Sequence, residues 1–360
     1  MGYHDIYKSC QDNPEAYWLE QSKAIDWEEA PRQALFDKGN DLYEWFADAK
    51  VNACYNAVDR HVENGRADQV AIIHDSPITG TQTKITFAEL QTRVAAVAGA
   101  LQANGVGKGD RVIIYMPMVP EAVEAMLACA RIGAVHSVVF GGFAANELAV
   151  RIDDCTPKAI IAASCGLEPN RIVAYKPLLD SAIDQSRHKP DFCLILQREQ
   201  SPCDMIEGRD LDWHDAQVGV APADCVPVQG NHPAYILYTS GTTGAPKGVI
   251  RQTAGHLVAL NWTMKNIYDV DPGDVFWAAS DVGWVVGHSY ICYGPLIHGN
   301  TTVVFEGKPV GTPDAGTFWR IISEHNVRSF FTAPTAIRAV KREDPKGEEI
   351  AKYDISCLRA

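Results

Sequence analysis

The sequence lacks the patterns that mark membrane, metal-binding and nucleic-acid-binding proteins. No apolar run reaches the roughly 18 residues of a membrane-spanning helix, and neither Cys-x-x-Cys nor His-x-x-x-His spacing occurs. Positive charge is scarce, because 32 Lys and Arg face 45 Asp and Glu, for a formal net charge of −13. We therefore expect no electrostatic surface for nucleic acid or anionic lipid. A polyanionic ligand would need a locally arranged site.

Targeting signals and paired cysteines are also missing. Residues 1–6 contain neither the positive nor the apolar region of a secretory signal. Ile6 stands where a myristoylation motif needs Ser or Thr. Several of the 10 cysteines, such as Cys129 and Cys193, lie inside apolar runs. We therefore expect buried, reduced thiols and a cytoplasmic protein, while the oligomeric state does not follow from the sequence.

The hydrophobic pattern changes near residue 65. Residues 1–65 are rich in aromatic side chains, and Asn13-Pro14 predicts a capped helix start. Because such a density of aromatic residues needs a larger partner, we expect a helical segment that wraps the rest of the chain.

From residue 66 onward, short apolar strands alternate with helices. Val70–Ile73, Arg111–Met116 and Phe192–Leu196 read as strands, and Thr86-x-x-Glu89 predicts a capped helix. The alternation indicates an α/β fold with parallel sheets flanked by helices, in which Val70–Ile73 belongs with the strands that follow it.

The second half of the chain repeats this pattern. Residues 200–232 are polar and read as a connection, after which a new strand–helix series begins at Ala234. Asp354–Ala360 reads as the approach to another strand.

The most informative motif is Tyr238–Val249, with the sequence YTSGTTGAPKGV. Glycines three residues apart allow a tight turn whose N–H groups converge, while hydroxyl side chains and Lys247 add donors and a positive charge. Such a loop suits phosphate oxygens. It is not a Walker A loop, because Pro246-Lys247-Gly248 replaces the required Lys-Ser/Thr step. A plain Ser/Thr/Gly surface loop is the alternative.

This string resembles the signature loop of the adenylate-forming acyl-CoA synthetases. The resemblance continues through Phe140–Phe143, Ser280–Ser289, Phe305–Gly307 and Thr332–Arg338. The segment with Tyr17-Trp18 and Trp45-Phe46 is similar to the region that precedes the acetyl-CoA synthetase core. Within the family, the chain looks most like short-chain enzymes of the propionyl-CoA synthetase type (short-chain family member 3).

The resemblance implies a division into an N-terminal segment, 1–65, and an incomplete AMP-binding core, 66–360. Family members are much longer, so their adenine and Mg²⁺ motif, ribose-binding Asp and mobile lid with its catalytic Lys are expected outside these residues. We accordingly expect no metal ligand in this portion and no catalysis by residues 1–360 alone.

The implied activity is that of a propionate–CoA ligase that uses ATP, Mg²⁺ and CoA. A carboxylate attacks the ATP α-phosphate, and the CoA thiolate then attacks the acyl-adenylate. Neither step needs a nucleophilic side chain, so positioning and charge stabilisation carry the catalysis.

The resemblance also assigns residues to three subsites. The ATP phosphates fall to Thr239, Ser240, Gly241, Thr242, Thr243, Gly244 and Lys247, with Lys247 as the catalytic charge. The carboxylate pocket falls to Trp284, Val285, Val286 and His288. CoA binding falls to Gly141, Gly142, Glu168, Pro169, Asn170, Arg171 and Val310. Glu168 departs from the basic residue of acetate enzymes, so only Arg171 is expected to pair with a CoA phosphate.

Other interpretations stay open at this point. The whole protein could prefer acetate, or the chain could be a non-catalytic piece that binds CoA or pairs with another chain. A P-loop ATPase is disfavoured by the loop sequence. For single residues, the alternatives are core packing of Trp284–Val286, a buried hydrogen-bonded His288, a plain strand-to-helix turn at Gly141-Gly142 and a solvent-facing Val310.

Overall fold

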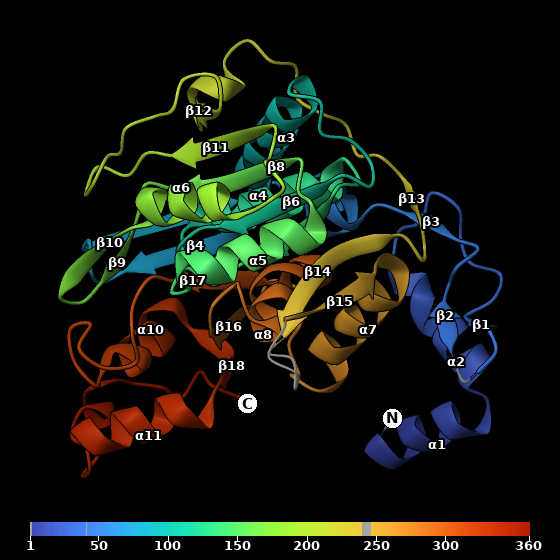
Figure 1. The fold of residues 1–360 in the computed structure, drawn as a ribbon. Coiled ribbons are helices and arrows are strands. Elements are labelled where there is room, and N and C mark those ends of the chain that lie inside the picture. Colours follow the sequence, from blue (N-terminus) through green and yellow to red (C-terminus); the bar gives the residue numbers. More distant parts are fainter. Residues whose placement is uncertain (1, 41, 240–245) are drawn as a thin grey trace.

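The computed structural model describes residues 2–40, 42–239 and 246–360, and it arranges most of them in two β-sheets with helices against their faces (Figure 1). The predicted α/β class is confirmed. Both sheets are mainly parallel, and each ends in one antiparallel strand pair.

The larger sheet has seven strands in the order β12-β11-β8-β6-β7-β14-β15. The strands span Asp210–Asp212 (β12), Phe192–Leu196 (β11), Ala159–Ala163 (β8), Arg111–Tyr115 (β6), Val135–Val138 (β7), Pro233–Thr239 (β14) and Lys247–Gln252 (β15). Only β14 and β15 run antiparallel. Residues 200–232 are more than a connection, because β12 within them forms the edge of this sheet.

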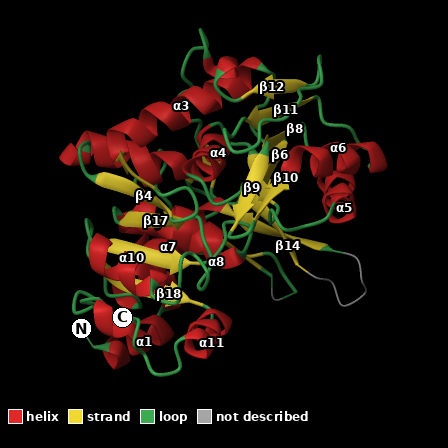
Figure 2. Ribbon diagram, turned by 90° about the vertical axis from the view of Figure 1, so that its left-hand side faces the viewer, coloured by secondary structure: helices red, strands yellow, loops and turns green. Residues whose placement is uncertain are grey.

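Helices cover both faces of the larger sheet. α3 (Phe87–Ala103) and α4 (Pro120–Arg131) lie on one face, and α5 (Ala145–Cys155) and α6 (Tyr175–Gln185) lie on the other (Figure 2). Alternate strand residues divide between these faces, since Val112 joins the α3–α4 core and Ile113 joins the α5–α6 core. Two buried faces explain the continuous apolar runs in the sequence.

The smaller sheet has five strands in the order β18-β16-β17-β4-β5. They span Val327–Thr332 (β18), Val275–Ala279 (β16), Thr301–Phe305 (β17), Val70–Ser76 (β4) and Thr81–Thr86 (β5). The grouping of Val70–Ile73 with the strands that follow it is therefore wrong, because β4 pairs with β17 over 200 residues later. Its helices are α10 (Thr317–His325) and α11 (Pro334–Glu343), whose buried residues share a core with β16, β17 and β18.

The N-terminal segment packs against the core as the aromatic residues predicted. It contains α1 (Tyr3–Asp12) and α2 (Pro14–Gln21), and the Asn13 side chain caps α2 by accepting the Ala16 N–H at 3.0 Å. Trp18 packs on Trp262 of α7 (Thr253–Asn266) with ring centroids 5.7 Å apart.

Short elements complete the fold. The antiparallel pairs are β1 (Leu35–Asp37) with β2 (Tyr43–Trp45), β3 (Lys50–Val51) with β13 (Val228–Gln229), and β9 (Cys165–Glu168) with β10 (Arg171–Ala174). Short helical turns span α8 (Val285–Gly287), α9 (Gly294–His298), Ser22–Ala24, Tyr55–Asp59, Val62–Arg66, Asp215–Gln217, His288–Tyr293 and Ile350–Lys352. The last residues lie along β18, where the Arg359 N–H donates to the Arg328 carbonyl at 2.7 Å.

Candidate functional site

The predicted phosphate loop is carried by the β14–β15 hairpin at the edge of the larger sheet. Thr239 ends β14 and lies directly opposite Lys247, the first residue of β15, and both side chains are exposed. Ser240, Gly241, Thr242, Thr243 and Gly244 lie outside the described residues. Next to the pair of Thr239 and Lys247 the hairpin is held against α5, because the Tyr238 hydroxyl donates to Asp154 Oδ2 at 2.5 Å. The two described members of the predicted phosphate site therefore lie opposite each other, at the end of β14 and the start of β15.

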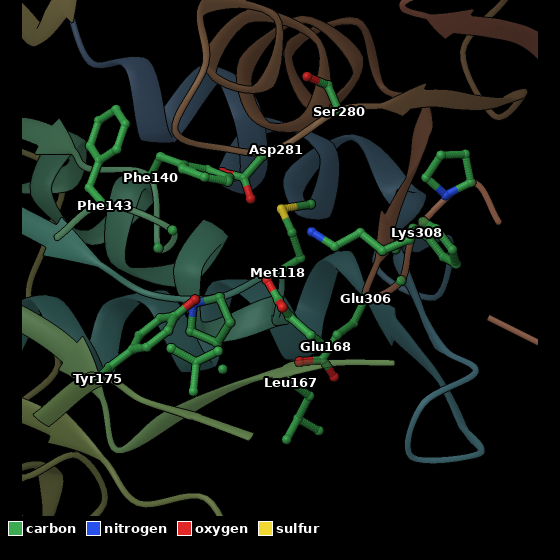
Figure 3. Close-up of a pocket in the computed structure, with 18 of the residues that line it drawn as sticks. Met118, Phe140, Phe143, Leu167, Glu168, Tyr175, Ser280, Asp281, Glu306 and Lys308 are labelled. Carbon is green, nitrogen blue, oxygen red and sulfur yellow. The ribbon is translucent and has the colours of Figure 1, made fainter. Parts of the chain in front are cut away.

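A cavity of about 340 Å³ opens where strands of both sheets end (Figure 3). The segments that follow the carboxyl ends of β6, β7, β16 and β17 supply much of its wall, as is usual for ligand sites in α/β sheets. The lining residues are Pro117, Met118, Phe140, Gly141, Gly142, Phe143, Ala144, Gly166, Leu167, Glu168, Arg171, Val173, Tyr175, Leu178, Ala279, Ser280, Asp281, Phe305, Glu306, Gly307, Lys308, Pro309, Phe318 and Ala336.

Four of the residues predicted to bind CoA come together in this cavity. They are Gly141 and Gly142, in the turn after β7, and Glu168 and Arg171, in the β9–β10 hairpin. Close packing explains the glycines, since a Cβ on Gly141 would lie 2.1 Å from Tyr175 Oη and one on Gly142 would lie 2.3 Å from Phe140 Cε1. The strand-to-helix turn and the cavity wall are thus the same feature.

The other residues predicted for CoA binding lie away from the lining. Pro169 and Asn170 are exposed at the tip of the β9–β10 hairpin. Val310 is half-buried and packs against the apolar cluster of the smaller sheet, so the solvent-facing alternative is wrong for its side chain. Their contact with CoA stays a prediction.

Charged groups in the cavity are partly paired. Glu168 Oε2 accepts from Arg171 Nε at 2.7 Å, and this hydrogen bond holds the pKa of Glu168 below and the pKa of Arg171 above the ordinary values. Glu306 is buried and accepts two hydrogen bonds from Arg198, at 2.7 and 3.0 Å. Arg171 is therefore paired with Glu168, whereas the sequence predicted it as the residue that pairs with a CoA phosphate.

Lys308 is a cavity cation that the motif analysis did not assign. Its side chain extends into the cavity toward Met118 (Figure 3). Among the described residues its ammonium group has neither an ion pair nor a hydrogen bond. Lys308 directly follows Phe305–Gly307, whose resemblance to the family was the sequence signal nearest to it.

Asp281 is a second residue that the motif analysis did not assign. Its carboxyl group points into the cavity, and Oδ1 accepts the Gly283 N–H at 2.8 Å (Figure 3). Burial raises the pKa of Asp281 to about 6, although the Gly283 N–H and the positive charge of Lys308 oppose the shift. The cavity thus holds a carboxyl group whose pKa of about 6 lies above the ordinary value of an aspartate.

The predicted carboxylate pocket adjoins this cavity. Trp284 is 48% exposed and Val285 is 44% exposed, so core packing is wrong for both. Val286 is half-buried against the main core. The Trp284 indole packs on Phe140 of the cavity wall with ring centroids 5.5 Å apart. Trp284 and Val285 are therefore available to a ligand beside the cavity.

His288 lies beneath this surface. It is fully buried, its Nδ1 hydrogen-bonds with the Trp284 carbonyl at 3.0 Å, and burial lowers its pKa to about 4. Its ring packs against Tyr235 and His136. The alternative of a buried, hydrogen-bonded histidine describes this side chain, which contacts the proposed pocket through the Trp284 carbonyl.

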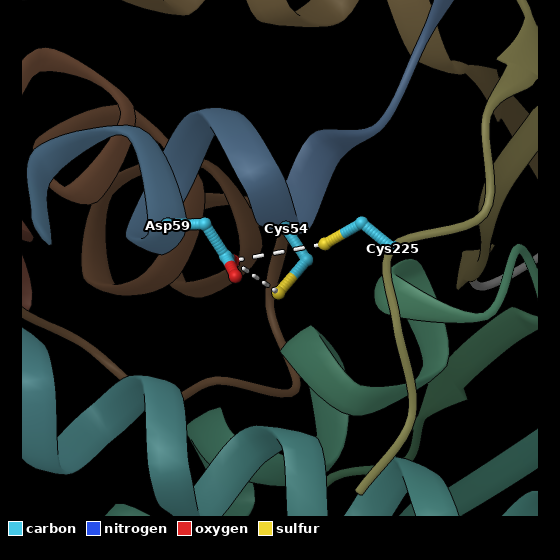
Figure 4. A group of neighbouring side chains, drawn as sticks. All are labelled: Cys54, Asp59 and Cys225. Carbon is cyan, nitrogen blue, oxygen red and sulfur yellow. Dashed lines mark hydrogen bonds between the residues drawn. The ribbon is translucent and has the colours of Figure 1, made fainter. Parts of the chain in front are cut away.

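Cys54, Asp59 and Cys225 form a separate cluster near the N-terminal segment (Figure 4). Both thiols donate to Asp59 Oδ2, at 4.0 and 3.7 Å, and Arg131 Nη1 donates to both carboxylate oxygens at 2.8 and 3.0 Å. The Cys54 thiol and burial raise the pKa of Cys225, which disfavours the thiolate that a metal needs. We interpret the cluster as a clamp between residues 54–59, α4 and the loop before β13.

The sequence matches two family descriptions. Residues 58–360 match the AMP-binding enzyme family, and residues 3–57 match the acetyl-coenzyme A synthetase N-terminus. In the described part of the chain, no helix has the length and apolar character needed to cross a membrane.

Several full-length proteins are similar to the chain. It is 56% identical over its whole length to an uncharacterised Pseudomonas aeruginosa protein, covering 57% of that protein. It is 54% identical over 98% of its length to the mitochondrial acyl-CoA synthetase short-chain family member 3 of Rattus norvegicus, covering 52% of it. It is 45% identical over 97% of its length to the acetyl-coenzyme A synthetase of Xanthobacter autotrophicus, covering 54% of it. The chain thus spans about half the length of the curated relatives it matches.

Proposed function

The chain belongs to the AMP-binding enzyme family, and on that premise we propose that it is part of a ligase that joins a short-chain carboxylic acid to coenzyme A. Because the relatives are about twice as long, the activity is proposed for a protein in which this chain is joined to the part that the relatives have in addition.

The proposed reaction has two steps. A carboxylate oxygen attacks the α-phosphorus of MgATP, pyrophosphate leaves and an acyl-adenylate forms. The coenzyme A thiolate then attacks the acyl carbonyl, the thioester forms and AMP leaves. The protein contributes by holding the reactants in line and stabilising the developing negative charge. Mg²⁺ enters as part of the MgATP substrate.

We assign the substrates to neighbouring surfaces of the chain. The pyrophosphate end of ATP would bind between Thr239 and Lys247. The acyl group would bind against Trp284, Val285 and Val286. The pantetheine arm of coenzyme A would bind in the cavity beside Gly141 and Gly142.

One observation carries the assignment of the acyl group and CoA. The Phe140 ring belongs to the cavity wall and also packs on the exposed Trp284. A thiol bound in the cavity and an acyl group bound at Trp284 would therefore meet at a shared wall, which thioester formation requires.

We propose propionate as the preferred acid. Val286 offers an apolar branched side chain where acetate enzymes of the family tend to have Thr, and the extra methyl group favours a longer alkyl chain. The second candidate is acetate, which is favoured by the 45% identity to an acetyl-coenzyme A synthetase.

Parallel assays with acetate, propionate and butyrate test this proposal. Carboxylate-dependent exchange of pyrophosphate into ATP measures the first step, and thioester formation measures the complete reaction. Propionate should give the highest kcat/KM. A protein without exchange for any of these acids would contradict the ligase, and a preference for acetate would leave the ligase and replace its substrate.

We further propose that residues 1–360 alone form no thioester, because they supply only part of the nucleotide site. Equilibrium binding of CoA and ATP to this polypeptide, assayed beside thioester formation, separates an inactive binding fragment from a complete enzyme. Turnover by residues 1–360 would contradict this part of the proposal.

We also propose the division at residue 65 and a cytoplasmic location, although the rat relative is named as mitochondrial. Limited proteolysis tests the boundary, and fractionation of the source cells tests the location. Cleavage only at sites away from residue 65, or recovery in an organelle fraction, would contradict them.

A further inference from the structure

The cavity contains six ionisable side chains, and five of them are unsuited to accept a proton. Glu168 and Arg171 are paired with each other at 2.7 Å, and Glu306 is bound by Arg198. Lys308 carries a positive charge, and burial holds the pKa of Tyr175 above its ordinary value, so its phenol stays protonated. Asp281 remains.

Asp281 is held in place while one of its oxygens stays available. Its Oδ1 accepts the Gly283 N–H at 2.8 Å, and Oδ2 has no hydrogen-bond partner within residues 2–40, 42–239 and 246–360. An oriented carboxyl group with a free oxygen can accept a proton from a ligand bound within hydrogen-bond reach, as a general base must.

The position of Asp281 matches the place where the two reactants would meet. A Cβ on Gly283 would lie 3.1 Å from Asp281 Oδ1 and 2.9 Å from Phe140 Cα, so the carboxyl group lies close to the Phe140 backbone. The Phe140 ring in turn packs on Trp284. Asp281 therefore lies at the junction between the cavity and the proposed acyl site.

We propose that Asp281 accepts the proton of the coenzyme A thiol during thioester formation, an inference that rests on the proposed function. As the S–H proton passes to Asp281 Oδ2, the sulfur electron pair forms the bond to the acyl carbon. The acyl–phosphate bond breaks and AMP leaves with its electron pair. Asp281 afterwards releases its proton to solvent, and no oxidant or reductant is needed.

The surrounding charges tune this role. Burial raises the pKa of Asp281 to about 6, and the Gly283 N–H and the positive charge of Lys308 favour the ionised carboxyl group and limit this shift. A base that titrates near the working pH is ionised at neutral pH and still takes up a proton readily. The paired Glu168 and Arg171 contribute little net charge at the cavity mouth.

Asp281→Asn tests the proposal in the full-length protein that contains this chain. Asn keeps an oxygen for the Gly283 N–H but cannot take up the proton. Thioester formation from preformed acyl-adenylate, followed in a single turnover, should slow by about 10²-fold. Pyrophosphate exchange should stay within about twofold, because the first step does not use the thiol. In the parent protein, the rate of thioester formation should rise as the pH increases through about 6. This rise of the rate with pH should be absent in Asp281→Asn.

Two further variants distinguish the loss of the carboxyl group from other effects of the substitution. Asp281→Glu keeps a carboxyl group and should retain the rise of the rate with pH. Asp314→Asn is the matched control, since Asp314 Oδ1 accepts the Gly316 N–H at 2.7 Å in the same Asp-x-Gly geometry but on the exposed surface. Unchanged thioester formation in Asp281→Asn, or a slow variant that keeps the rise of the rate with pH, would overturn the proposal. Loss of exchange in the parent protein would instead overturn the proposed function.

Discussion

At the residue scale, the chemistry of the site depends on a few side chains that face a ligand. The signature motifs supplied the candidates Lys247, Trp284 and Val286. The cavity adds Asp281 and Lys308, whose proposed roles depend on the residues that line the cavity around them. Two predictions at this scale concern residues assigned from the motifs.

The first prediction concerns Lys247, the first residue of β15, which lies opposite Thr239. Lys247→Ala in the full-length protein should slow adenylate formation by roughly 10- to 10³-fold, because it removes positive charge beside the leaving pyrophosphate. The readout is carboxylate-dependent exchange of pyrophosphate into ATP. Lys84→Ala, on the exposed face of β5, is the control and should leave the rate unchanged. An unaltered rate in Lys247→Ala would contradict the assignment.

The second prediction concerns the half-buried Val286. Propionate should exceed acetate in kcat/KM by roughly 10- to 200-fold, the range expected for one methylene in an apolar pocket. Val286→Thr should narrow that ratio, since a hydroxyl replaces a methyl group that touches the alkyl end.

Val218→Thr provides the same substitution at a side chain that is 77% exposed and lies outside the proposed pocket. It should keep the parental ratio. If Val286→Thr also kept it, the substrate size would have to be set by other residues.

At the element scale, buried polar contacts join strands and helices that are distant in sequence. Arg198 follows β11 of the larger sheet, and Glu306 follows β17 of the smaller sheet. Glu306 accepts two hydrogen bonds from Arg198 and one from Ser76 at 2.9 Å. This ion pair therefore fixes the ends of the two sheets against each other, beside the cavity.

The third prediction follows from this ion pair. Glu306→Gln should lower the free energy of unfolding by roughly 3–5 kcal/mol, because Arg198 would remain as an uncompensated buried charge. Urea unfolding followed by fluorescence measures the change. The double variant Arg198→Met/Glu306→Leu should recover much of the loss, since no charge is then buried.

Glu343→Gln is the control for this experiment. Glu343 pairs with Arg342 on the surface, where both side chains are more than half exposed, so its loss should cost less than about 1 kcal/mol. Equal losses for Glu306→Gln and Glu343→Gln would contradict the proposed role of the buried pair.

The fourth prediction concerns the histidines between the larger sheet and α7. His136 and His256 pack on Tyr235 of β14, with ring centroids 5.5 and 5.3 Å away, and His288 packs on it at 4.6 Å. Burial lowers the pKa of His136 well below its usual value, that of His256 to about 3 and that of His288 to about 4.

Because these pKa values are depressed in the folded state, the unfolded chain binds more protons below pH about 6.5. The free energy of unfolding should thus fall as the pH is lowered from 7 to 5, by up to about 1.4 kcal/mol per pH unit for each histidine. Urea unfolding at several pH values measures this slope. His256→Gln should reduce it, whereas His4→Gln at the exposed N-terminal helix should not. Equal slopes in His256→Gln and the parent would contradict this account.

At the scale of the whole molecule, the smaller sheet combines strands that come before and after those of the larger sheet in the sequence. β4 and β5 precede every strand of the larger sheet, yet they complete the smaller one. The N-terminal segment similarly reaches forward in sequence, since Trp18 packs on Trp262 and the Trp262 Nε1–H donates to the Tyr17 hydroxyl at 2.7 Å. These long-range contacts join segments that are far apart in the sequence into one packed structure.

Local sequence patterns were sufficient to predict individual helices and strands such as α3 and β11. The Thr86–Glu89 capping box begins α3 as predicted, because both of its hydrogen bonds form within one turn. The apolar run Phe192–Leu196 forms β11 with the predicted bounds, and the described ends of the motif at Tyr238–Val249 lie on the paired strands β14 and β15. Each of these signals depends on a few neighbouring residues only, so the element it predicts does not depend on the tertiary contacts of the rest of the chain.

Strand partners and charge pairing were decided by the tertiary structure. Nothing in the sequence of Val70–Ser76 distinguishes pairing with β17 from pairing with the nearer β6, because an apolar strand fits either neighbour. Arg198 and Glu306 are 108 residues apart, and only their shared burial makes them an ion pair. Asp281 is likewise one carboxyl group among many until the fold places it in the wall of the cavity that Phe140 and Lys308 also line. Its pKa is set by desolvation and by neighbouring charges, which exist only once the chain has folded.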